Sequence, residues 1–408
     1  STGRPKAAQV THHGANNLLH WYVGELQAGE DDRPLIISSL SFDLTQKNLW
    51  SPLLLGGCVV FSTVTQYDAE KIVQEIALHQ VTRINCAPSA FYPLLTEREM
   101  WTHLASLQQL WLGGESIAMN ILQPWLQHSG CALINSYGPT ECTDVVSWYR
   151  VAPEEDNPPI GRPISNTQLY VLNSHLSFCP VGTPGELWIG GAGVGLGYLG
   201  RSELTAEKFI ADPFSDDPQA RLYRTGDLAQ WQADGSVAYL GRLDDQVKIR
   251  GFRIELGEIT QHLLQHEHVS AATVIAREGK TPSLAAFVVA SEPVLTPALL
   301  RQHLLISLPG WMVPAQILLL PALPLTPNGK IDKKALLALP MPETTSDIMT
   351  TARTPVEAGV AAIFAEVLGV SQVGVDDNFF ELGGHSLSAT QVLARVRHRF
   401  APDLALHT

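Results

Sequence analysis

One serine near the end of the sequence stands where a side chain could do covalent chemistry. Ser386 follows two glycines and a histidine in "DDNFFELGGHSLSAT", residues 376–390, directly before an amphipathic run. Three interpretations are open: a catalytic nucleophile in a strained strand-to-helix turn, a serine that is covalently modified, or a simple helix N-cap. The first predicts a hydrolase whose ester cleavage is lost in Ser386→Ala.

The residues around Ser386 favour modification over hydrolysis. A nucleophile turn needs a buried strand before the serine and a closing glycine, whereas "GVDDNFFELGG" offers acidic residues and a turn. A helix N-terminus presents free backbone N–H groups and the positive end of the helix dipole to an anion such as a phosphodiester. Arg395, Arg397 and Arg399 suit the other end of such a helix.

Two helices are predicted around this serine. Thr354-Pro355-Val356-Glu357 has the N-cap, the first-position proline and the third-position glutamate of a capping box. Apolar residues at 360, 363, 364, 367 and 368 continue that helix, and those at 389, 392, 393, 396 and 400 share one face of a helix that follows Ser386. Residues 354–408 therefore form a small all-helical module, preceded by an aperiodic linker of residues 339–353.

A second stretch that could do chemistry opens the chain. "STGRPKAAQVTHHG", residues 1–14, has small residues, a glycine and a lysine at the spacing of a loop that holds phosphate. It departs from the GxxxxGK[ST] pattern, so taken alone it does not establish nucleotide binding.

Composition bounds the class of protein. A chain of 408 residues with 45% hydrophobic and 16% charged residues is long enough for two or three domains, each with its own core. The net charge of −13 argues against nucleic acid as a partner, because binding to the phosphate backbone depends on clustered Lys and Arg. The scattered cysteines, without a C-x-x-C pair, indicate neither a disulfide framework nor a zinc site and fit a cytoplasmic protein.

Hydrophobic periodicity divides the chain before residue 339. Residues 1–241 alternate short apolar runs, such as 34–38, 57–61 and 133–135, with helical patterns such as 69–79, which predicts layered α/β structure. Residues 242–338 have shorter runs, including 271–276 and 284–289, and predict a small α+β unit. The most apolar stretch, residues 304–325, is repeatedly interrupted by proline and no signal peptide opens the chain, so no membrane segment is expected.

Seven segments, in order, resemble the adenylation domain of nonribosomal peptide synthetases. Besides residues 1–14, they are "NSYGPTECTD" (135–144), "GELWIGGAGVGLGYLG" (185–200), "YRTGDLAQW" (223–231), "GRLDDQVKIRGFRIELGEI" (241–259), "LPGWMVP" (308–314) and "PNGKIDKKAL" (327–336). The stretch "DNFFELGGHSLSA" resembles the attachment site of peptidyl carrier domains. This resemblance covers nearly the whole chain.

The fold that the resemblance implies has three parts. These are a layered α/β adenylation core (1–241), a small mobile α+β subdomain (242–338) and an all-α four-helix-bundle carrier domain (354–408). Because the sequence begins inside the phosphate loop and stops within the carrier fold, the N-terminal part of the core and the end of the carrier domain are expected to lie outside these residues.

The resemblance also implies a reaction and its cofactors. A carboxylate attacks the α-phosphate of ATP and expels pyrophosphate, and the acyl group then passes to the thiol of 4′-phosphopantetheine on the serine that matches Ser386. Charge develops on phosphoryl oxygens, so catalysis depends on positioned donors and on cations, including Mg²⁺. The matching residues are Ser1, Thr2, Gly3 and Lys6 for the β- and γ-phosphates, Tyr137 for adenine, Thr140 and Glu141 for phosphate and Mg²⁺, and Asp227 and Arg242 for the ribose.

Two further matches concern motion between the half-reactions. Lys330 matches the mobile catalytic lysine of the family, and Asp244 matches the hinge aspartate about which the C-terminal subdomain swings. The resemblance implies that Lys330 leaves and the loop at Gly251 enters before the thiol attacks the adenylate.

A predicted substrate lining follows from the same resemblance. It comprises Asp43, Leu44, Lys47, Asn85, Trp111, Gly113, Ser136, Asp144, Val145 and Lys330. In this family a carboxylate at Asp43 pairs with the α-ammonium, which favours an amino acid over acids that lack an amine. An apolar substrate would bury Lys47, Asn85 and Asp144 without partners, so Gln, Glu, Asn or Asp is predicted. The alternative is that Lys47 and Asp144 pair with each other outside the pocket.

The predicted function is a synthetase segment that activates an amino acid and loads its own carrier as a thioester. Expected partners are a phosphopantetheinyl transferase, neighbouring condensation, thioesterase or other synthetase domains, and a small activator protein. Alternatives are a related acyl-CoA or aryl-acid ligase, and a degenerate ligase that acts only as a carrier or interaction module. The degenerate ligase predicts no ATP–pyrophosphate exchange, so a substrate panel in that assay separates it from the others.

Overall fold

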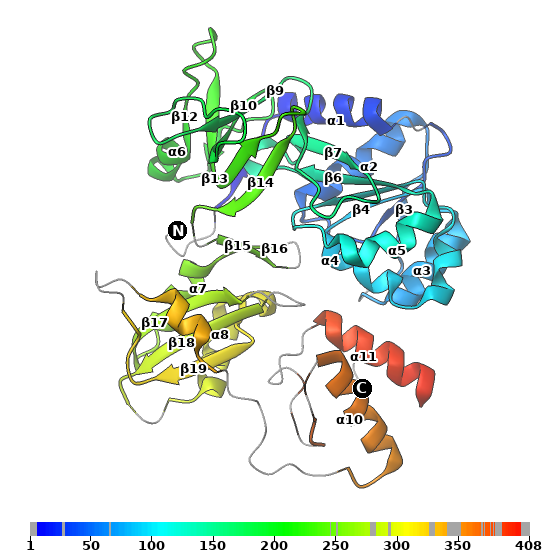
Figure 1. Cartoon of the computed structure of the whole chain (residues 1–408), viewed down its shortest axis with the longest axis vertical. Helices are drawn as coiled ribbons and strands as arrows, with labels where there is room; N and C mark the ends of the chain where they lie inside the picture. The colour runs from blue at the N-terminus through cyan, green and yellow to red at the C-terminus, as the bar shows by residue number, and fades with distance from the viewer. Residues whose placement is uncertain are drawn as a thin grey trace. The chain divides into compact units, whose positions relative to one another are not determined.

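The computed structural model describes residues 6–26, 29–64, 67–244, 246–249, 252–277, 283–292, 295–325, 331–340, 352–368, 370, 372–375, 377, 379 and 386–400. The chain divides into two compact units, and this division falls directly after Asp244. Figure 1 shows the helices and strands of both units.

A seven-stranded sheet forms a large part of the first unit. Its order is β3-β2-β4-β5-β6-β7-β8, with β3, β2, β4, β5 and β6 parallel and with β7 and β8 antiparallel to their neighbours. The strands are β2 (Pro34–Ile36), β3 (Val60–Phe61), β4 (Arg83–Cys86), β5 (Gln109–Gly113), β6 (Ala132–Tyr137), β7 (Ser147–Val151) and β8 (Arg162–Pro163). The strands predicted from the apolar runs at 34–38, 57–61 and 133–135 are therefore confirmed.

Helices cover both faces of this sheet (Figure 1). On one face lie α3 (Ala69–His79), α5 (Met119–Ser129), α4 (Pro88–Phe91) and the 3-10 helices η1 (Tyr92–Leu95) and η2 (Arg98–Leu104), which share an apolar core with the strands. On the other face lie α1 (His12–Leu26) and α2 (Asp43–Leu55), whose core with the sheet includes Tyr22, Trp111 and Ile134. Helix α3 has the bounds predicted from its periodicity, and the Asp68 side chain caps it by accepting from the Lys71 backbone N–H.

Helix α2 has an inverted distribution of side chains. Its buried residues are mainly polar: Thr45, Lys47, Asn48, Ser51 and Pro52. Trp50, Leu53 and Leu54, in contrast, are 54%, 61% and 65% exposed. The helix therefore turns hydrogen-bonding groups toward the sheet.

Residues 167–242 form an antiparallel sheet, so the α/β alternation predicted for residues 1–241 ends before this region. The order is β12-β13-β10-β9, with β14 paired to β13. The strands are β9 (Thr167–Leu172), β10 (Gly185–Gly191), β12 (Phe209–Ala211), β13 (Arg221–Trp231) and β14 (Val237–Arg242). Burial alternates along the first half of β9, as expected for an antiparallel strand with one face on a core. Nearby, β1 (Ala8–Gln9) pairs with β11 (Gly197–Tyr198), and α6 (Ser202–Lys208) is short.

The second unit contains a small α+β part. A hairpin of β15 (Gln246–Ile249) and β16 (Phe252–Glu255) precedes an antiparallel pair, β17 (Val269–Arg277) and β18 (Ser283–Ala290), to which β19 (Gln316–Leu320) adds in parallel. Helices α7 (Leu256–Leu264) and α8 (Pro297–Ser307) and the 3-10 helix η4 (Gly310–Met312) contribute to one core, and α9 (Lys333–Ala338) contributes Leu336 to a second. The strands predicted at 271–276 and 284–289 are confirmed.

Two helices, α10 (Pro355–Leu368) and α11 (Ser386–Arg399), make up most of the described C-terminal module. The predicted capping box is confirmed: Thr354 Oγ1 accepts from the Glu357 N–H at 3.1 Å, and Glu357 Oε2 accepts from the Thr354 N–H at 3.2 Å. Ile363, Val392 and Val396 form the buried contact between the two helices. The remainder of the predicted four-helix bundle lies outside the described residues.

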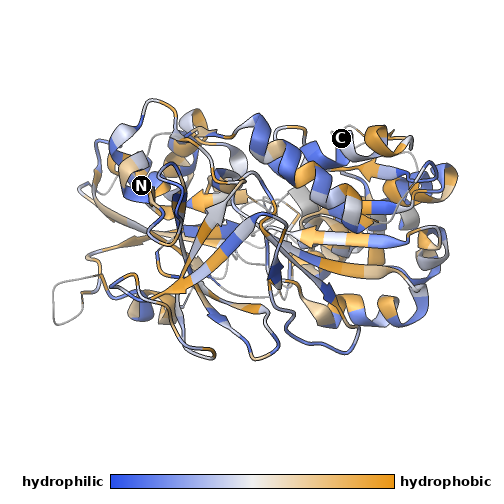
Figure 2. Ribbon diagram, turned by 90° about the horizontal axis from the view of Figure 1, so that it is seen from above, coloured by the Kyte–Doolittle hydropathy of each residue, from blue (hydrophilic) through white to orange (hydrophobic). Residues whose placement is uncertain are grey.

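The distribution of apolar residues follows these cores. Figure 2 shows apolar residues, in orange, along many of the strands and hydrophilic residues, in blue, along stretches of helix. In the part of the chain that the structure describes, no helix is both long and apolar enough to cross a lipid bilayer.

Candidate functional site

Several of the predicted site residues of the first unit gather at the carboxyl edge of the seven-stranded sheet. Asp43 begins the helix that follows β2, Asn85 lies one residue before the end of β4, Gly113 ends β5 and Tyr137 ends β6. These four strands are parallel, so their carboxyl ends share one edge, which is where open α/β sheets bind ligands.

The strand register places several lining residues on one face. Asn85 pairs with Trp111, and Gly113 pairs with Ser136. Register partners point to the same face, and Trp111 belongs to the core beneath α1 and α2, together with Val145. A Cβ atom on Gly113 would stand 2.6 Å from Ser136 Oγ, so this close approach of β5 and β6 requires glycine.

Lys47 and Asp144 form a buried ion pair. Lys47 Nζ lies 2.5 Å from Asp144 Oδ2 and donates to the Leu44 carbonyl at 3.1 Å, and the two residues are 1% and 9% exposed. Thr143 and Asp144 both have left-handed backbones, with φ of 60° and 65°, which is an unfavourable conformation for residues other than glycine. Burial raises the pKa of Asp144 to about 6, Asp43 acts in the same direction, and Lys47 opposes both. The ion pair that the alternative interpretation requires is therefore present.

Asp43 is hydrogen-bonded to the loop after β6. Its Oδ2 accepts a hydrogen bond from Thr140 Oγ1, and its Oδ1 accepts from the Leu44 N–H at 2.8 Å. Thr140 begins the 3-10 helix η3 (Thr140–Cys142), so two residues predicted for different parts of the substrate meet at the start of α2.

Glu141 is held by a tyrosine that the sequence analysis did not single out. The buried Glu141 carboxylate accepts from the Tyr198 hydroxyl at 2.6 Å, and Lys6 Nζ lies 5.6 Å from the centre of the Tyr198 ring. Burial and the Glu141 carboxylate raise the pKa of Tyr198, so its phenol remains a donor. Tyr198 stands in the glycine-rich segment 185–200, but its spacing carries no signal of this contact.

A second constellation joins four predicted residues. The Tyr137 hydroxyl donates to Asp227 Oδ2, and Arg242 Nη1 donates to Asp227 Oδ1 at 2.8 Å. Arg242 also donates through Nε to Asp244 Oδ1 at 2.8 Å. Asp227 and Arg242 are register partners in β13 and β14, and burial together with Asp227 raises the pKa of Tyr137. The structure thus connects the predicted adenine, ribose and hinge residues in one hydrogen-bonded chain.

A buried charge network beside Asn85 was not predicted. Arg83 Nη2 lies 2.6 Å from Asp32 Oδ2 and donates to Ser51 Oγ at 3.2 Å, while Arg83 Nη1 donates to the Tyr22 hydroxyl at 2.6 Å and to Asn48 Oδ1 at 3.1 Å. Arg83 and Asp32 are both buried. The network ties β4 to α1 and to the inverted face of α2.

Some predicted residues fall outside the described part of the chain. Ser1, Thr2, Gly3, Gly251 and Lys330 all do so. Ser386 is the first residue of α11, although the placement of its side chain is not described.

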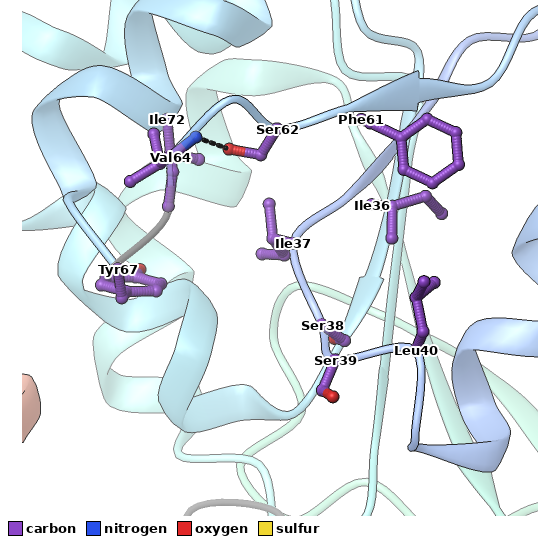
Figure 3. Close-up of a pocket in the computed structure, with 10 residues that line it drawn as sticks. All are labelled: Ile36, Ile37, Ser38, Ser39, Leu40, Phe61, Ser62, Val64, Tyr67 and Ile72. Atoms are coloured by element: carbon purple, nitrogen blue, oxygen red, sulfur yellow. Dashed lines mark hydrogen bonds between the residues drawn. The ribbon is translucent and has the colours of Figure 1, made fainter.

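A pocket of about 320 Å³ lies at the carboxyl ends of β2 and β3 (Figure 3). Its lining combines apolar side chains with serines and comprises Ile36, Ile37, Ser38, Ser39, Leu40, Phe61, Ser62, Val64, Tyr67 and Ile72. None of the predicted site residues is in this lining, so this pocket is distinct from the candidate site.

The acidic residues of the site suit Mg²⁺ only in company with a ligand. Among the described residues no group of three His, Cys, Asp or Glu side chains is arranged to hold a metal ion. Mg²⁺ in nucleotide sites, however, takes one or two carboxylates and completes its shell with phosphate oxygens and water. Glu141 fits that requirement. Its carboxylate is held by Tyr198, whose ring also lies close to Lys6, and Thr140 is the preceding residue in the sequence.

Three known families match successive parts of the chain. Residues 1–199 match the family described as "AMP-binding enzyme", residues 258–330 match "AMP-binding enzyme C-terminal domain", and residues 358–408 match "Phosphopantetheine attachment site". The fold and site therefore define an AMP-binding enzyme joined to a carrier domain.

Similar proteins of known type include a nonribosomal peptide synthase. A dimodular nonribosomal peptide synthase of Bacillus subtilis (strain 168) is 42% identical over 414 residues, which cover 100% of this chain and 17% of the relative. Malpibaldin synthetase of Mortierella alpina is 41% identical over 421 residues, which cover 100% of this chain and 7% of that relative. The chain thus spans less than a fifth of the length of either relative.

Solved structures agree with these relatives. The holo form of a nonribosomal peptide synthetase protein containing adenylation and PCP domains, bound to a vinylsulfonamide inhibitor, has a TM-score of 0.80 and 30% identity over 97% of this chain and 66% of that chain. The Vibrio cholerae adenylation domain AlmE, in complex with glycyl-adenosine-5'-phosphate, has a TM-score of 0.72 and 26% identity over 82% of this chain and 64% of that chain. The chain belongs to the nonribosomal peptide synthetases, as an adenylation domain followed by a carrier domain.

Proposed function

We propose that the protein activates an amino acid with ATP to an aminoacyl adenylate and loads it as a thioester on its own carrier domain. The observation that carries this proposal is the chain of contacts from Tyr137 through Asp227 to Arg242, in a polypeptide whose helix α11 begins at Ser386. The relatives and the matched families support the same conclusion.

Asp227 and Tyr137 would bind the nucleoside. Each oxygen of the Asp227 carboxylate already accepts one hydrogen bond, and each has a second lone pair for a ribose hydroxyl. The Tyr137 ring lies 6.3 Å from the ring of Tyr239 and offers an aromatic surface for a base. Arg242 fixes the orientation of the Asp227 carboxylate through a charge-assisted hydrogen bond.

Lys6, Thr140 and Glu141 would meet the phosphates. Mg²⁺, when bound, supplies charge that offsets the phosphate oxygens. Tyr198 holds the Glu141 carboxylate in place for that ion, and Lys6 near the same ring is positioned for a phosphate oxygen. We assign Ser1, Thr2 and Gly3 to the same phosphates, and Lys330 to the carboxylate and α-phosphate of the reacting pair, on the family resemblance.

Asp43 separates the proposal from its nearest alternative. A carboxylate at the first residue of α2 suits the α-ammonium of an amino acid, which acyl-CoA and aryl-acid substrates lack. The substrate ammonium would replace the Thr140 hydroxyl as the partner of Asp43 Oδ2 and release Thr140 toward phosphate. The buried polar residues Lys47, Asn85 and Asp144 support a polar side chain, with Gln, Glu, Asn or Asp as candidates.

The domain boundaries we propose separate the residues assigned to the nucleotide, to Lys330 and to the carrier. Residues 1–241 are the adenylation core, 242–338 the subdomain that carries Lys330, 339–353 a linker and 354–408 the carrier domain. Asp244, bonded to Arg242 at the end of the first unit, is the proposed hinge residue. Rotation there exchanges Lys330 for the Gly251 loop between the half-reactions.

Ser386 is the proposed attachment point of 4′-phosphopantetheine. The arm, when attached, supplies the thiol that accepts the aminoacyl group. The first residue of α11 is suited to this modification because the helix N-terminus favours the phosphodiester anion. A phosphopantetheinyl transferase and neighbouring synthetase modules are the implied partners, and we further propose cytoplasmic localisation and a small activator protein.

The test uses the full-length protein. Treatment with a phosphopantetheinyl transferase and coenzyme A should add one arm, located by peptide mass spectrometry at Ser386, and Ser386→Ala should lose it. ATP–pyrophosphate exchange with amino acids should persist in Ser386→Ala. Modification at another residue, or exchange only with acids lacking an amine, would contradict the proposal.

A further inference from the structure

The arrangement of Lys47, Asn85 and Asp144 identifies the chemistry of the substrate side chain. We propose that the activated amino acid carries a primary carboxamide, as glutamine and asparagine do, and that these three residues contact it. The proposal rests on the amino-acid activation proposed above and narrows it to one class of side chain.

Arg83 locates Asn85 relative to helix α2. Arg83 donates to Asn48 at 3.1 Å and to Ser51 at 3.2 Å, which fixes where β4 and α2 face each other. Asn85 is two residues further along β4, on the same face and ~6–7 Å nearer the carboxyl edge. Helix α2 begins at that edge and runs away from it, so Lys47 lies ~1.5 Å nearer to the edge along the helix axis than Asn48 and ~6 Å nearer than Ser51. Asn85 and Lys47 therefore both lie on the carboxyl-edge side of the contacts that Arg83 makes with α2.

Asn85 has a donor that no described residue uses. It is 6% exposed, and its Nδ2 is buried without a hydrogen-bond partner among the residues that the structure describes. Buried side-chain amides normally have partners, because an unsatisfied donor loses its bonds to water without replacement. The neighbouring side chain of Trp111 donates to Gln109 and offers no acceptor, so the described part of the site leaves this donor to a ligand or to water.

Lys47 and Asp144 add a donor and an acceptor of opposite charge. Together the three residues present the Lys47 ammonium and the Asn85 amide as donors, and the Asp144 carboxylate as an acceptor. A carboxamide matches this set: its carbonyl oxygen accepts two hydrogen bonds, and its NH₂ group donates to a carboxylate. It also leaves the ion pair intact, whereas an aliphatic side chain would leave the Asn85 donor unused.

The charge balance excludes the charged alternatives. Asp43, Lys47 and Asp144 carry two negative charges and one positive charge, and the α-ammonium of the substrate offsets the remaining negative charge. A side-chain carboxylate would bring a further negative charge toward Asp144 and Asp43, and a side-chain ammonium would add an unpaired positive charge, each beside the buried pair of Lys47 and Asp144. A neutral carboxamide preserves the balance.

The experiment is ATP–pyrophosphate exchange by the full-length protein with Gln, Asn, Glu, Asp, Lys, Thr, Leu and norleucine. We expect Gln or Asn to exchange at least tenfold faster than Glu or Asp at equal concentration. Gln against Asn distinguishes the two lengths of the carboxamide side chain. Strongest exchange with Glu, Asp, Lys, Thr or an aliphatic amino acid would overturn the carboxamide assignment while leaving amino-acid activation in place.

Two variants link the preference to these residues. Asp144→Asn leaves Lys47 without its anion and should shift the preference toward Glu or Asp, whereas the combined Lys47→Leu and Asp144→Val change should shift it toward Leu or norleucine. Lys71→Leu is the matched control, because Lys71 is in an exposed pair 3.9 Å from Asp68 on the other face of the sheet, and should leave the order unchanged. An unchanged order in both site variants would overturn the proposal.

The outcome also distinguishes this inference from the function on which it rests. Absence of exchange with every amino acid, in protein whose Ser386 is still modified by the transferase, would refute amino-acid activation itself. A normal exchange rate with a different side-chain class would refute only the carboxamide assignment.

Discussion

At the scale of single residues, Asp144 combines burial, a cationic partner and a left-handed backbone in one side chain. Gly138 contributes to this geometry, because a Cβ there would stand 1.6 Å from the Asp144 carbonyl oxygen. The loop after β6 therefore passes close to its own start, which aims the Asp144 carboxylate at Lys47. A glycine at the start of that loop and a strained aspartate further along it thus define the ion pair.

The proton on Asp144 should stabilise the folded protein at acid pH. Burial raises the pKa of Asp144 to about 6 from an ordinary value of 3.8, so the folded state binds this proton more tightly than the unfolded chain does. The contribution is fully present below the unfolded pKa, is lost as pH rises through about 6, and amounts to at most about 3 kcal/mol. The difference in free energy of unfolding between the wild type and Asp144→Asn, from urea titrations at pH 4 to 8, should fall across that window.

A flat difference between the two proteins would contradict the raised pKa. Asp217→Asn serves as the control, because Asp217 is an exposed carboxylate in a surface turn. Its pH dependence should follow that of the wild type.

Residues could be predicted from the sequence where a motif repeats a known spacing. Tyr137, Asp227, Arg242 and Asp244 all stand in quoted motifs, and the structure connects them. Tyr198 could not be singled out, because its contact with Glu141 depends on the pairing of β1 with β11. Arg83 and Asp32 carry charges that are ordinarily solvated, so their burial has no signature in composition or periodicity.

At the scale of elements, the inverted helix α2 is held by charge and hydrogen bonds as well as by apolar packing. Asn48 and Ser51 of α2 both accept from Arg83 of β4, and Asp32 precedes β2 and neutralises that guanidinium. Hydrophobic periodicity cannot predict such a helix, because the side that faces the core is polar. The antiparallel sheet of residues 167–242 was missed for a related reason: β10 and β13 contain runs of consecutive buried residues, so buried and exposed positions do not alternate regularly along them. Helix α3, with an ordinary apolar face, was predicted to the residue.

Arg83→Met should destabilise the first unit strongly. The change leaves the Asp32 carboxylate buried without its cation, and breaking a buried pair typically costs about 3–5 kcal/mol in free energy of unfolding. Urea unfolding followed by tryptophan fluorescence measures it, because Trp111 lies in the adjoining core. Arg33→Met is the matched control, since the neighbouring Arg33 is exposed, and should change stability by about 0.5 kcal/mol or less.

Adding Asp32→Asn to Arg83→Met should recover part of the lost stability, because the isolated charge is then removed. If Arg83→Met cost no more than Arg33→Met, the network would be unimportant for the fold.

Thr354→Ala should weaken the start of helix α10. The substitution removes the oxygen that accepts from the Glu357 N–H, and loss of an N-cap typically costs about 1 kcal/mol. Amide hydrogen exchange at the first turn of α10 should accelerate about fivefold, which corresponds to that free energy at ambient temperature. Thr354→Ser retains a capping hydroxyl and should exchange like the wild type; acceleration in both variants would point to another cause.

At the scale of the whole molecule, the order of motifs predicted an adenylation domain followed by a carrier domain, and the family matches confirm it. The residues to which we assign roles in the chemistry are divided between the parts: Glu141 and Asp227 lie in the first unit, while Lys330 and Ser386 follow Asp244 in the sequence. A reaction in two steps therefore has its proposed catalytic groups on both sides of that division.

Lys330→Ala should separate the two half-reactions. Loss of one charge-stabilising contact typically costs about 3 kcal/mol, so exchange of pyrophosphate should fall roughly a hundredfold. Transfer to the carrier from preformed aminoacyl adenylate, measured as thioester on holo protein, should fall far less. Lys333→Ala, a nearby lysine in α9, is the control for exchange. Equal loss in both half-reactions would make Lys330 structural or would refute the proposed rotation.

The guanidinium of Arg242 divides its donors between Asp227, across the β13–β14 ladder, and Asp244, the last residue before the second unit. Two interactions that share one group are linked thermodynamically: whatever strengthens or weakens one must alter the other by a reciprocal free energy. If Asp227 binds the ribose, then nucleotide occupancy and the conformation at Asp244 are coupled through a single side chain. A substitution that removes the bond between Arg242 and Asp244 should thus change the affinity for the nucleotide, although no atom of Asp244 is assigned to the nucleotide.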